Sequence, residues 1–120
     1  MKLAVTSTGK TLEDAMDLSF GRAKYFLVVD TESGEIEVVD NTQVINVPQG
    51  AGIQAARQVV EKGVEAVASG NFGPNAFRAL GEAGVGTYVS RGGKVEDVIA
   101  AFKDGKLQKV DDATIEGHWV

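Results

Sequence analysis

The sequence contains no cysteine and only one histidine, His118, close to its end. Without cysteine the chain can form no disulfide and can offer no thiolate to a metal ion. One imidazole supplies at most one metal ligand, and it cannot complete a serine–histidine–aspartate triad unless the end of the chain folds back. We therefore expect neither a metal ion ligated by protein side chains nor an acyl-transfer enzyme.

Long apolar runs and clusters of basic residues are also missing. No run approaches the ~20 apolar residues of a membrane-spanning helix, and Met1–Val5 lead directly into a strand without a signal-peptide core. The 12 lysine and arginine residues are scattered and the formal net charge is −5, whereas nucleic-acid phosphates are bound by clustered positive charge. We predict a cytoplasmic protein that binds neither membranes nor nucleic acid.

The motifs of metal-dependent hydrolysis and of nucleotide binding are incomplete. Glu37 is the one acid in the middle of an expected strand, and it falls on the exposed face, so a two-metal centre has no ligands. Gly9-Lys10-Thr11 resembles the end of a P-loop, but Ala4 stands where that motif needs its first glycine. Residues 50–55 match the dinucleotide pattern G-x-G-x-x-A, but the next strand ends without an acidic residue. We predict that the chain is not an enzyme.

Apolar segments alternate with glycine turns along the 120 residues, which include 15 glycines. This alternation predicts one domain over residues 1–107, followed by a polar tail over residues 108–120. Strands are expected at residues 3–5, 25–29, 36–39, 66–68 and 87–89, with helices over residues 50–63, 74–84 and 95–105. The order of these elements predicts a three-layer α/β/α sandwich around a mixed five-stranded sheet.

Residues 66–77 read as a buried strand, a turn and the start of a helix. Gly70 and Gly73 let the backbone turn, and Pro74 suits the first helical position, where no backbone N–H is needed. The free N–H groups of such a helix start, together with the helix dipole, favour an anion. Residues 50–52 and 91–93 are expected at the same edge of the sheet, where open sheets bind ligands. The alternative is a tight, well-capped connection that binds nothing.

Polar side chains near these turns complete the expected site. Arg22 follows Gly21 just before a central strand, and Arg91 lies in the last turn. Either guanidinium could bind an anion or could be an ordinary surface charge, and we favour Arg22. Asn71 and Asn75 add neutral donors at the neighbouring turn.

Five blocks of sequence, in their order and spacing, resemble the dinitrogenase iron-molybdenum cofactor biosynthesis family. They are Phe20-Gly21-Arg22-Ala23, Gly50-Ala51-Gly52-Ile53-Gln54-Ala55-Ala56, Gly63-Val64-Glu65-Ala66-Val67, Gly70-Asn71-Phe72-Gly73-Pro74-Asn75-Ala76-Phe77 and Phe102-Lys103-Asp104-Gly105-Lys106-Leu107. The resemblance implies a ribonuclease H-like α/β fold. It also implies a nitrogenase accessory protein that binds or carries iron-molybdenum cofactor or its precursor.

The chain departs from this family in two informative ways, of which the first is that it has no cysteine to act as a cluster ligand. Accessory proteins that hold the cofactor are often credited with a histidine before the Phe-Gly-Arg-Ala block, and here Asp17-Leu18-Ser19 stand there. A cluster would therefore be held as an anion by backbone N–H groups, Arg22 and asparagine side chains, with weak and reversible affinity. The expected cofactor-binding residues are Ser19, Gly21, Arg22, Gly50, Gly52, Gly70, Asn71, Gly73 and Asn75, with no catalytic and no metal-ligating residue.

Two classes of function remain open from the sequence. The first is a non-catalytic carrier of an anionic iron-molybdenum-type cluster or an iron-sulfur or molybdenum precursor, with another cluster-assembly protein as its partner. A sensor of a small anion or nucleotide differs from this carrier only in its ligand. The second is a protein-interaction module whose glycine turns are purely structural and whose tail, with Trp119, docks on a partner.

Overall fold

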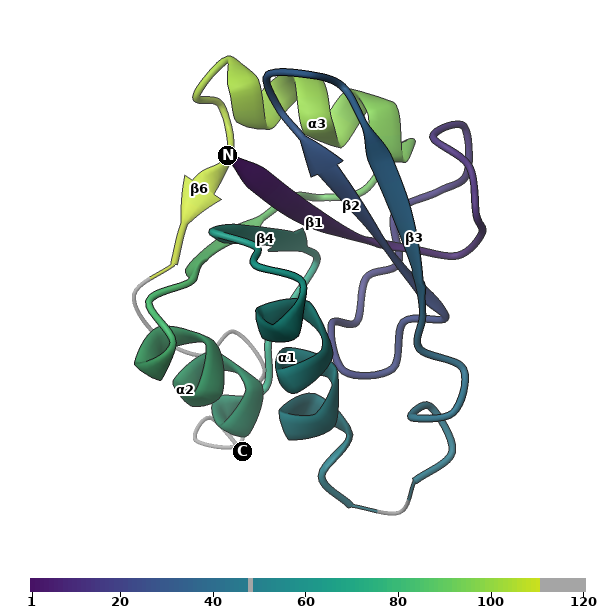
Figure 1. Cartoon of the computed structure of the whole chain (residues 1–120), viewed down its shortest axis with the longest axis vertical. Helices are drawn as coiled ribbons and strands as arrows, with labels where there is room; N and C mark the ends of the chain where they lie inside the picture. The colour runs from purple at the N-terminus through teal and green to yellow at the C-terminus, as the bar shows by residue number, and fades with distance from the viewer. Residues whose placement is uncertain (48, 111–120) are drawn as a thin grey trace.

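The computed structural model describes residues 1–47 and 49–110 and shows an α/β domain (Figure 1). Its elements in chain order are β1 (Lys2–Ser7), β2 (Tyr25–Asp30), β3 (Ile36–Asp40), α1 (Ala51–Glu61), β4 (Ala66–Ser69), α2 (Pro74–Glu82), β5 (Gly86–Val89), α3 (Val95–Lys103) and β6 (Gln108–Lys109). Their order agrees with the prediction as far as α3. In this described part, none of the helices has the length and apolar character needed to span a bilayer.

The sheet has six strands, so the prediction of five strands is wrong. The additional strand, β6, pairs antiparallel with β5, Gln108 lying opposite Val89 and Lys109 opposite Tyr88. Both residues of β6 are exposed, so no alternation of apolar and polar residues marks this strand in the sequence. The following residue, Val110, packs against the core. His118 and Trp119 of the predicted tail lie outside the described residues.

The strand order is β3-β2-β1-β4-β5-β6, with β3 and β6 at the edges (Figure 1). Strands β1, β4 and β5 are mutually parallel, and β2 is antiparallel to both of its neighbours. Strand β3 consequently runs in the same direction as β1. Because α1, α2 and α3 follow β3, β4 and β5, all three helices begin at the same edge of the sheet, as predicted.

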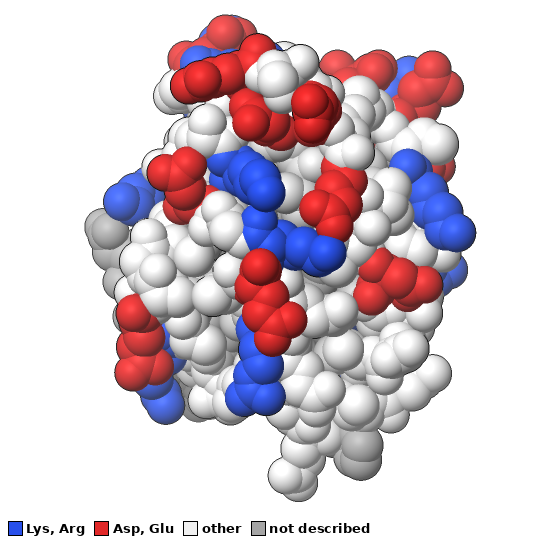
Figure 2. All heavy atoms as spheres, in the orientation of Figure 1, with Lys and Arg blue, Asp and Glu red and all other residues white. Residues whose placement is uncertain are grey.

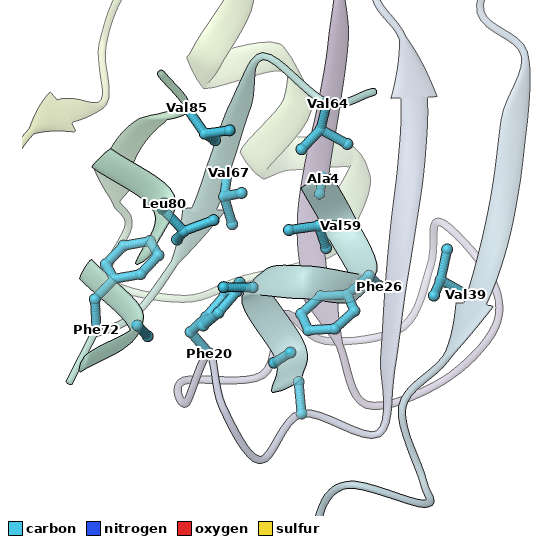
Figure 3. Close-up of a cluster of buried hydrophobic side chains, with 14 of the residues drawn as sticks. Ala4, Phe20, Phe26, Val39, Val59, Val64, Val67, Phe72, Leu80 and Val85 are labelled. Atoms are coloured by element: carbon cyan, nitrogen blue, oxygen red, sulfur yellow. The ribbon is translucent and has the colours of Figure 1, made fainter. Parts of the chain in front are cut away.

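Alternate side chains of the central strands point to opposite faces of the sheet and pack against different helices. On one face, Ala4, Phe26 and Val67 pack against residues of α1 and α2 (Figure 3). On the other face, Leu3, Val5 and Leu27 pack against residues of α3. The three-layer arrangement follows from these two cores. Phe20 extends the first core toward the helix starts, its ring centroid lying 5.3 Å from Phe26 and 5.4 Å from Phe72.

Strand β3 lies at an edge of the sheet, and most of its side chains are exposed. Ile36 and Val38 are 43% and 41% exposed, while Val39 is buried. The reason is that Ile36 and Val38 lie on the α3 side of the sheet, and α3 packs mainly against β1. Glu37 is exposed, as predicted, and forms an ion pair with Lys62 of the α1 C-cap.

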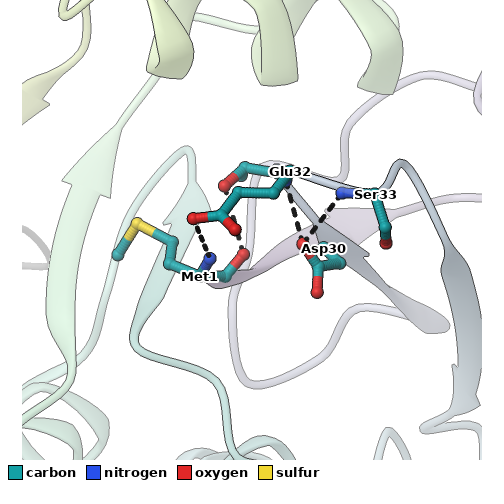
Figure 4. Close-up of polar contacts among 5 residues, drawn as sticks. Met1, Asp30, Glu32 and Ser33 are labelled. Atoms are coloured by element: carbon teal, nitrogen blue, oxygen red, sulfur yellow. Dashed lines mark hydrogen bonds and ion pairs between the residues drawn. The ribbon is translucent and has the colours of Figure 1, made fainter.

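The turn between β2 and β3 is held by hydrogen bonds to one carboxylate (Figure 4). Asp30 Oδ1 accepts the backbone N–H groups of Glu32 at 2.9 Å and Ser33 at 3.2 Å. These bonds lower the pKa of Asp30. The same turn contacts the start of the chain, since the backbone N–H of Thr31 donates to the carbonyl oxygen of Met1 at 2.9 Å.

Candidate functional site

The starts of α1 and α2 lie against each other because small residues occupy the contact. A methyl group added at Gly52 of α1 would stand 3.0 Å from the Cβ atom of Ala76 in α2. A methyl group added at Gly21 would stand 3.1 Å from the backbone nitrogen of Gly52. Gly50, which precedes α1, has a left-handed backbone with φ of 80° that other residues rarely adopt. Glycine at these positions therefore allows the two helix starts and the Gly21 turn to meet.

A pocket of about 270 Å³ lies at this meeting point, and we call it the helix-start pocket. It is lined by Ser19, Gly21, Arg22, Gly50, Ala51, Gly52, Gly73, Pro74, Asn75 and Ala76. Seven of the nine residues predicted to bind a cofactor are therefore brought together: Ser19, Gly21, Arg22, Gly50, Gly52, Gly73 and Asn75. Ala51, Pro74 and Ala76 also line the pocket; they were not among the predicted binding residues, because their apolar side chains carry no signal of binding.

Backbone N–H groups at the two helix starts lack hydrogen-bond partners. Among the described residues, the amides of Ala51, Gly52, Ile53, Asn75 and Ala76 donate to no protein acceptor. Neither helix has a side-chain cap, and neither has an acidic residue in its first turn. Helix starts are commonly satisfied by such groups. The positive ends of two helix dipoles are thus left uncompensated beside one pocket.

The start of α3 differs from those of α1 and α2, because its backbone N–H groups have partners. The N–H groups of Val95 and Glu96 donate to the carbonyl oxygens of Asp14 and Leu12, both at 2.9 Å. Glu96 and Asp97 also place negative charge in the first turn of this helix. Residues 91–93 lie at the expected edge of the sheet. The first N–H groups of α3, which follows them, already donate to carbonyl oxygens of Leu12 and Asp14.

Arg22 stands at the rim of the helix-start pocket and is exposed. Its Nη1 donates to the carbonyl oxygens of Ile45 at 2.6 Å and Val47 at 3.2 Å. Its backbone N–H donates to Ser19 Oγ at 3.3 Å. A guanidinium carries five N–H groups, so these contacts fix its position and leave donors for a ligand.

Gly70 and Asn71, the other two predicted residues, lie in a separate cavity of about 620 Å³. We call it the strand-end cavity, and it is lined by Leu18, Gly70, Asn71, Val89, Ser90, Arg91, Lys106, Leu107 and Gln108. The two hollows flank the segment Leu18–Ser19, which pairs with Asn71 through a bond from Phe20 N–H to the carbonyl oxygen of Asn71 at 3.3 Å. The nine residues were predicted to form one site, but in the structure they are divided between the helix-start pocket and the strand-end cavity.

The side chains of residues 1–47 and 49–110 include no group of three histidine, cysteine, aspartate or glutamate residues able to hold a metal ion. The helix-start pocket itself has no acidic side chain in its lining. On the face shown in Figure 2, acidic side chains gather at the upper end, and acidic and basic side chains lie side by side across the middle. The chemistry available in the helix-start pocket is therefore hydrogen-bond donation to an anion by backbone amides and Arg22.

Comparison with known proteins gives a consistent result. A family model described as dinitrogenase iron-molybdenum cofactor matches residues 1–105. The apo form of the orange protein from Desulfovibrio gigas is 33% identical, with a TM-score of 0.92 over 95% of this chain and 96% of that one. A Thermotoga protein of the DUF35 family, provisionally assigned as a NifB protein, is 42% identical, with a TM-score of 0.85 over 97% and 98% of the two chains. An uncharacterised protein of Methanocaldococcus jannaschii is 33% identical over 95 residues, which cover 77% of this chain and 80% of that protein.

Proposed function

Because the chain belongs to the dinitrogenase iron-molybdenum cofactor family, we propose that it is a non-catalytic carrier of an anionic iron-molybdenum-type cluster or its precursor. The cargo binds in the helix-start pocket. The observation that carries this proposal is the set of unpartnered amides at the starts of α1 and α2, beside a pocket without acidic groups. The orange protein is similar in fold and sequence, and its structure is described as an apo form. That protein is thus described in a ligand-free state, which supports a ligand-binding role for this chain.

The donor set favours an intact anion over a bare metal ion. Backbone N–H groups and a guanidinium donate hydrogen bonds to oxygen or sulfur atoms of an anion, and they offer no lone pair to a metal. Ser19 supplies the one hydroxyl in the pocket lining, and its oxygen already accepts the N–H of Arg22. The lining has no general base and no activated nucleophile, which supports a binding role without catalysis.

The expected affinity for a simple anion is modest. Two charge-assisted hydrogen bonds of about 1.5 kcal/mol each and a dipole contribution of about 1 kcal/mol give about 4 kcal/mol, or a Kd of about 1 mM. A larger cluster that engages more donors binds more tightly. Weak and reversible binding suits a carrier, which must release its cargo to another protein of cluster assembly.

An anaerobic titration of the full chain with tetrathiomolybdate, followed by amide NMR, tests the proposal. We expect saturable shifts at Gly52, Asn75 and Ala76, with Gly81 at the far end of α2 as an internal reference. Inorganic phosphate and a nucleotide in parallel titrations separate the carrier from a sensor of phosphate compounds. No shift at millimolar tetrathiomolybdate would refute the carrier function.

A further inference from the structure

We propose that the strand-end cavity is a second ligand site, which takes a small organic anion with an apolar body. Its volume of about 620 Å³ falls within the range of small-molecule sites. It lies across the Leu18–Ser19 segment from the helix-start pocket and uses different residues.

The apolar part of this site is a wall formed by Leu18, Val89 and Leu107. Leu18 is 54% exposed and contributes apolar surface to this wall. Gly70 lies directly against it. A methyl group at Gly70 would stand 2.7 Å from the backbone oxygen and 2.9 Å from the Cδ2 atom of Leu18. Glycine at position 70 therefore allows Leu18 to lie where it does in the wall.

The charged part of the site consists of Arg91 and Lys106. The lining contains no aspartate or glutamate, and within the described residues neither cation takes part in an ion pair. Two positive charges without a counterion, on a chain of net charge −5, favour a negatively charged ligand group. The apolar wall and the two cations together suit a ligand that carries a negative charge on a hydrophobic body.

Asn71 gives a second, independent indication of a ligand. Its Oδ1 is buried and has no hydrogen-bond partner in the part of the chain that the structure describes. Buried amide oxygens are normally paired, and an unpaired one needs an explanation. Among the described residues the Asn71 side chain has no hydrogen-bond partner, so its amide group is available to a ligand in the cavity that it lines.

Isothermal titration calorimetry and amide NMR of the full metal-free chain test the site with three probes. The probes are 2-naphthoate, its neutral counterpart 2-naphthamide, and acetate, which has the charge without the apolar body. We expect saturable binding of 2-naphthoate alone, with shifts at Gly70, Ser90 and Leu107. Equal binding of the neutral amide, or shifts confined to other parts of the chain, would overturn the proposal.

A double variant, Arg91→Gln with Lys106→Gln, should weaken 2-naphthoate binding at least about tenfold, because it removes two charged donors. The matched control, Arg57→Gln with Lys103→Gln, removes two exposed cations from α1 and α3 and should bind as the natural chain does. Unchanged affinity in the first variant would refute the site. Because no metal is present, these results are independent of the carrier proposal.

Discussion

Substitution of Gly52 by alanine tests whether the close approach of α1 and α2 makes the helix-start pocket an anion site. The new Cβ atom would stand 3.0 Å from the Cβ atom of Ala76, so the two helix starts must move apart. Overpacking of this kind costs about 1–3 kcal/mol, and alanine in a helix recovers up to about 1 kcal/mol. The net loss of unfolding free energy should be about 0–3 kcal/mol, which leaves the chain folded.

The effect on binding should exceed the effect on folding. Displacing one amide from the anion removes one charge-assisted hydrogen bond of about 1.5 kcal/mol, which is about a tenfold increase in Kd for tetrathiomolybdate. Calorimetry under anaerobic conditions measures this change, and urea denaturation measures stability. The matched control is Gly81→Ala in α2, where nothing lies within 4 Å of the added methyl group. This control should be slightly more stable and should bind normally.

A compensating substitution makes the reasoning refutable. Adding Ala76→Gly to Gly52→Ala removes the Cβ atom that the new methyl group meets, so the helix starts can return to their original spacing. We expect the double variant to recover most of the lost affinity, although its α2 is weakened by about 1 kcal/mol. Normal binding by Gly52→Ala, or failure of the second substitution to restore binding, would show that helix spacing does not control the site.

Two other substitutions and one change of pH have measurable expected outcomes. Gly21→Ala places a methyl group 3.1 Å from the nitrogen of Gly52 and should weaken anion binding about tenfold, as measured by calorimetry. Tetrathiomolybdate affinity should be constant between about pH 6 and 8, because Arg22 is the one ionisable side chain in the lining; a pH-dependent Kd would contradict this. The lowered pKa of Asp30 stabilises the fold above the ordinary aspartate pKa of about 3.9, and this stabilisation is lost as pH falls through the lowered value. Asp30→Asn should therefore reduce stability to urea at neutral pH, and its difference from the natural chain should shrink under acid; a constant difference would refute the assignment.

Local signals account for the parts of the fold that the sequence predicts. Residues 66–69 are small and fully buried, and Pro74 opens α2 as expected from its missing N–H. The helix-start pocket follows from such signals because every helix begins where a strand of the same direction ends. The sequence shows glycine at positions 21 and 52. It does not show that Gly21 and Gly52 are in contact, because that contact depends on how α1 packs against α2.

The features that sequence reasoning missed arise from contacts between distant segments. The start of α3 is satisfied by carbonyl oxygens of Leu12 and Asp14, and backbone acceptors in an irregular loop leave no residue pattern. Strand β6 has two exposed residues and exists because it pairs with β5. The division between two cavities depends on the pairing of Ser19 with Asn71, which no local pattern encodes.

Anomalous diffraction at the molybdenum edge, from a crystal soaked anaerobically in tetrathiomolybdate, locates the bound anion without reference to activity. We predict a peak in the helix-start pocket, within hydrogen-bond reach of the backbone nitrogens of Gly52 and Ala76. Anomalous density at the start of α3, where the N–H groups of Val95 and Glu96 are already hydrogen-bonded, would contradict the role of the unpartnered amides in binding. The absence of anomalous density near the starts of α1 and α2 would contradict it as well.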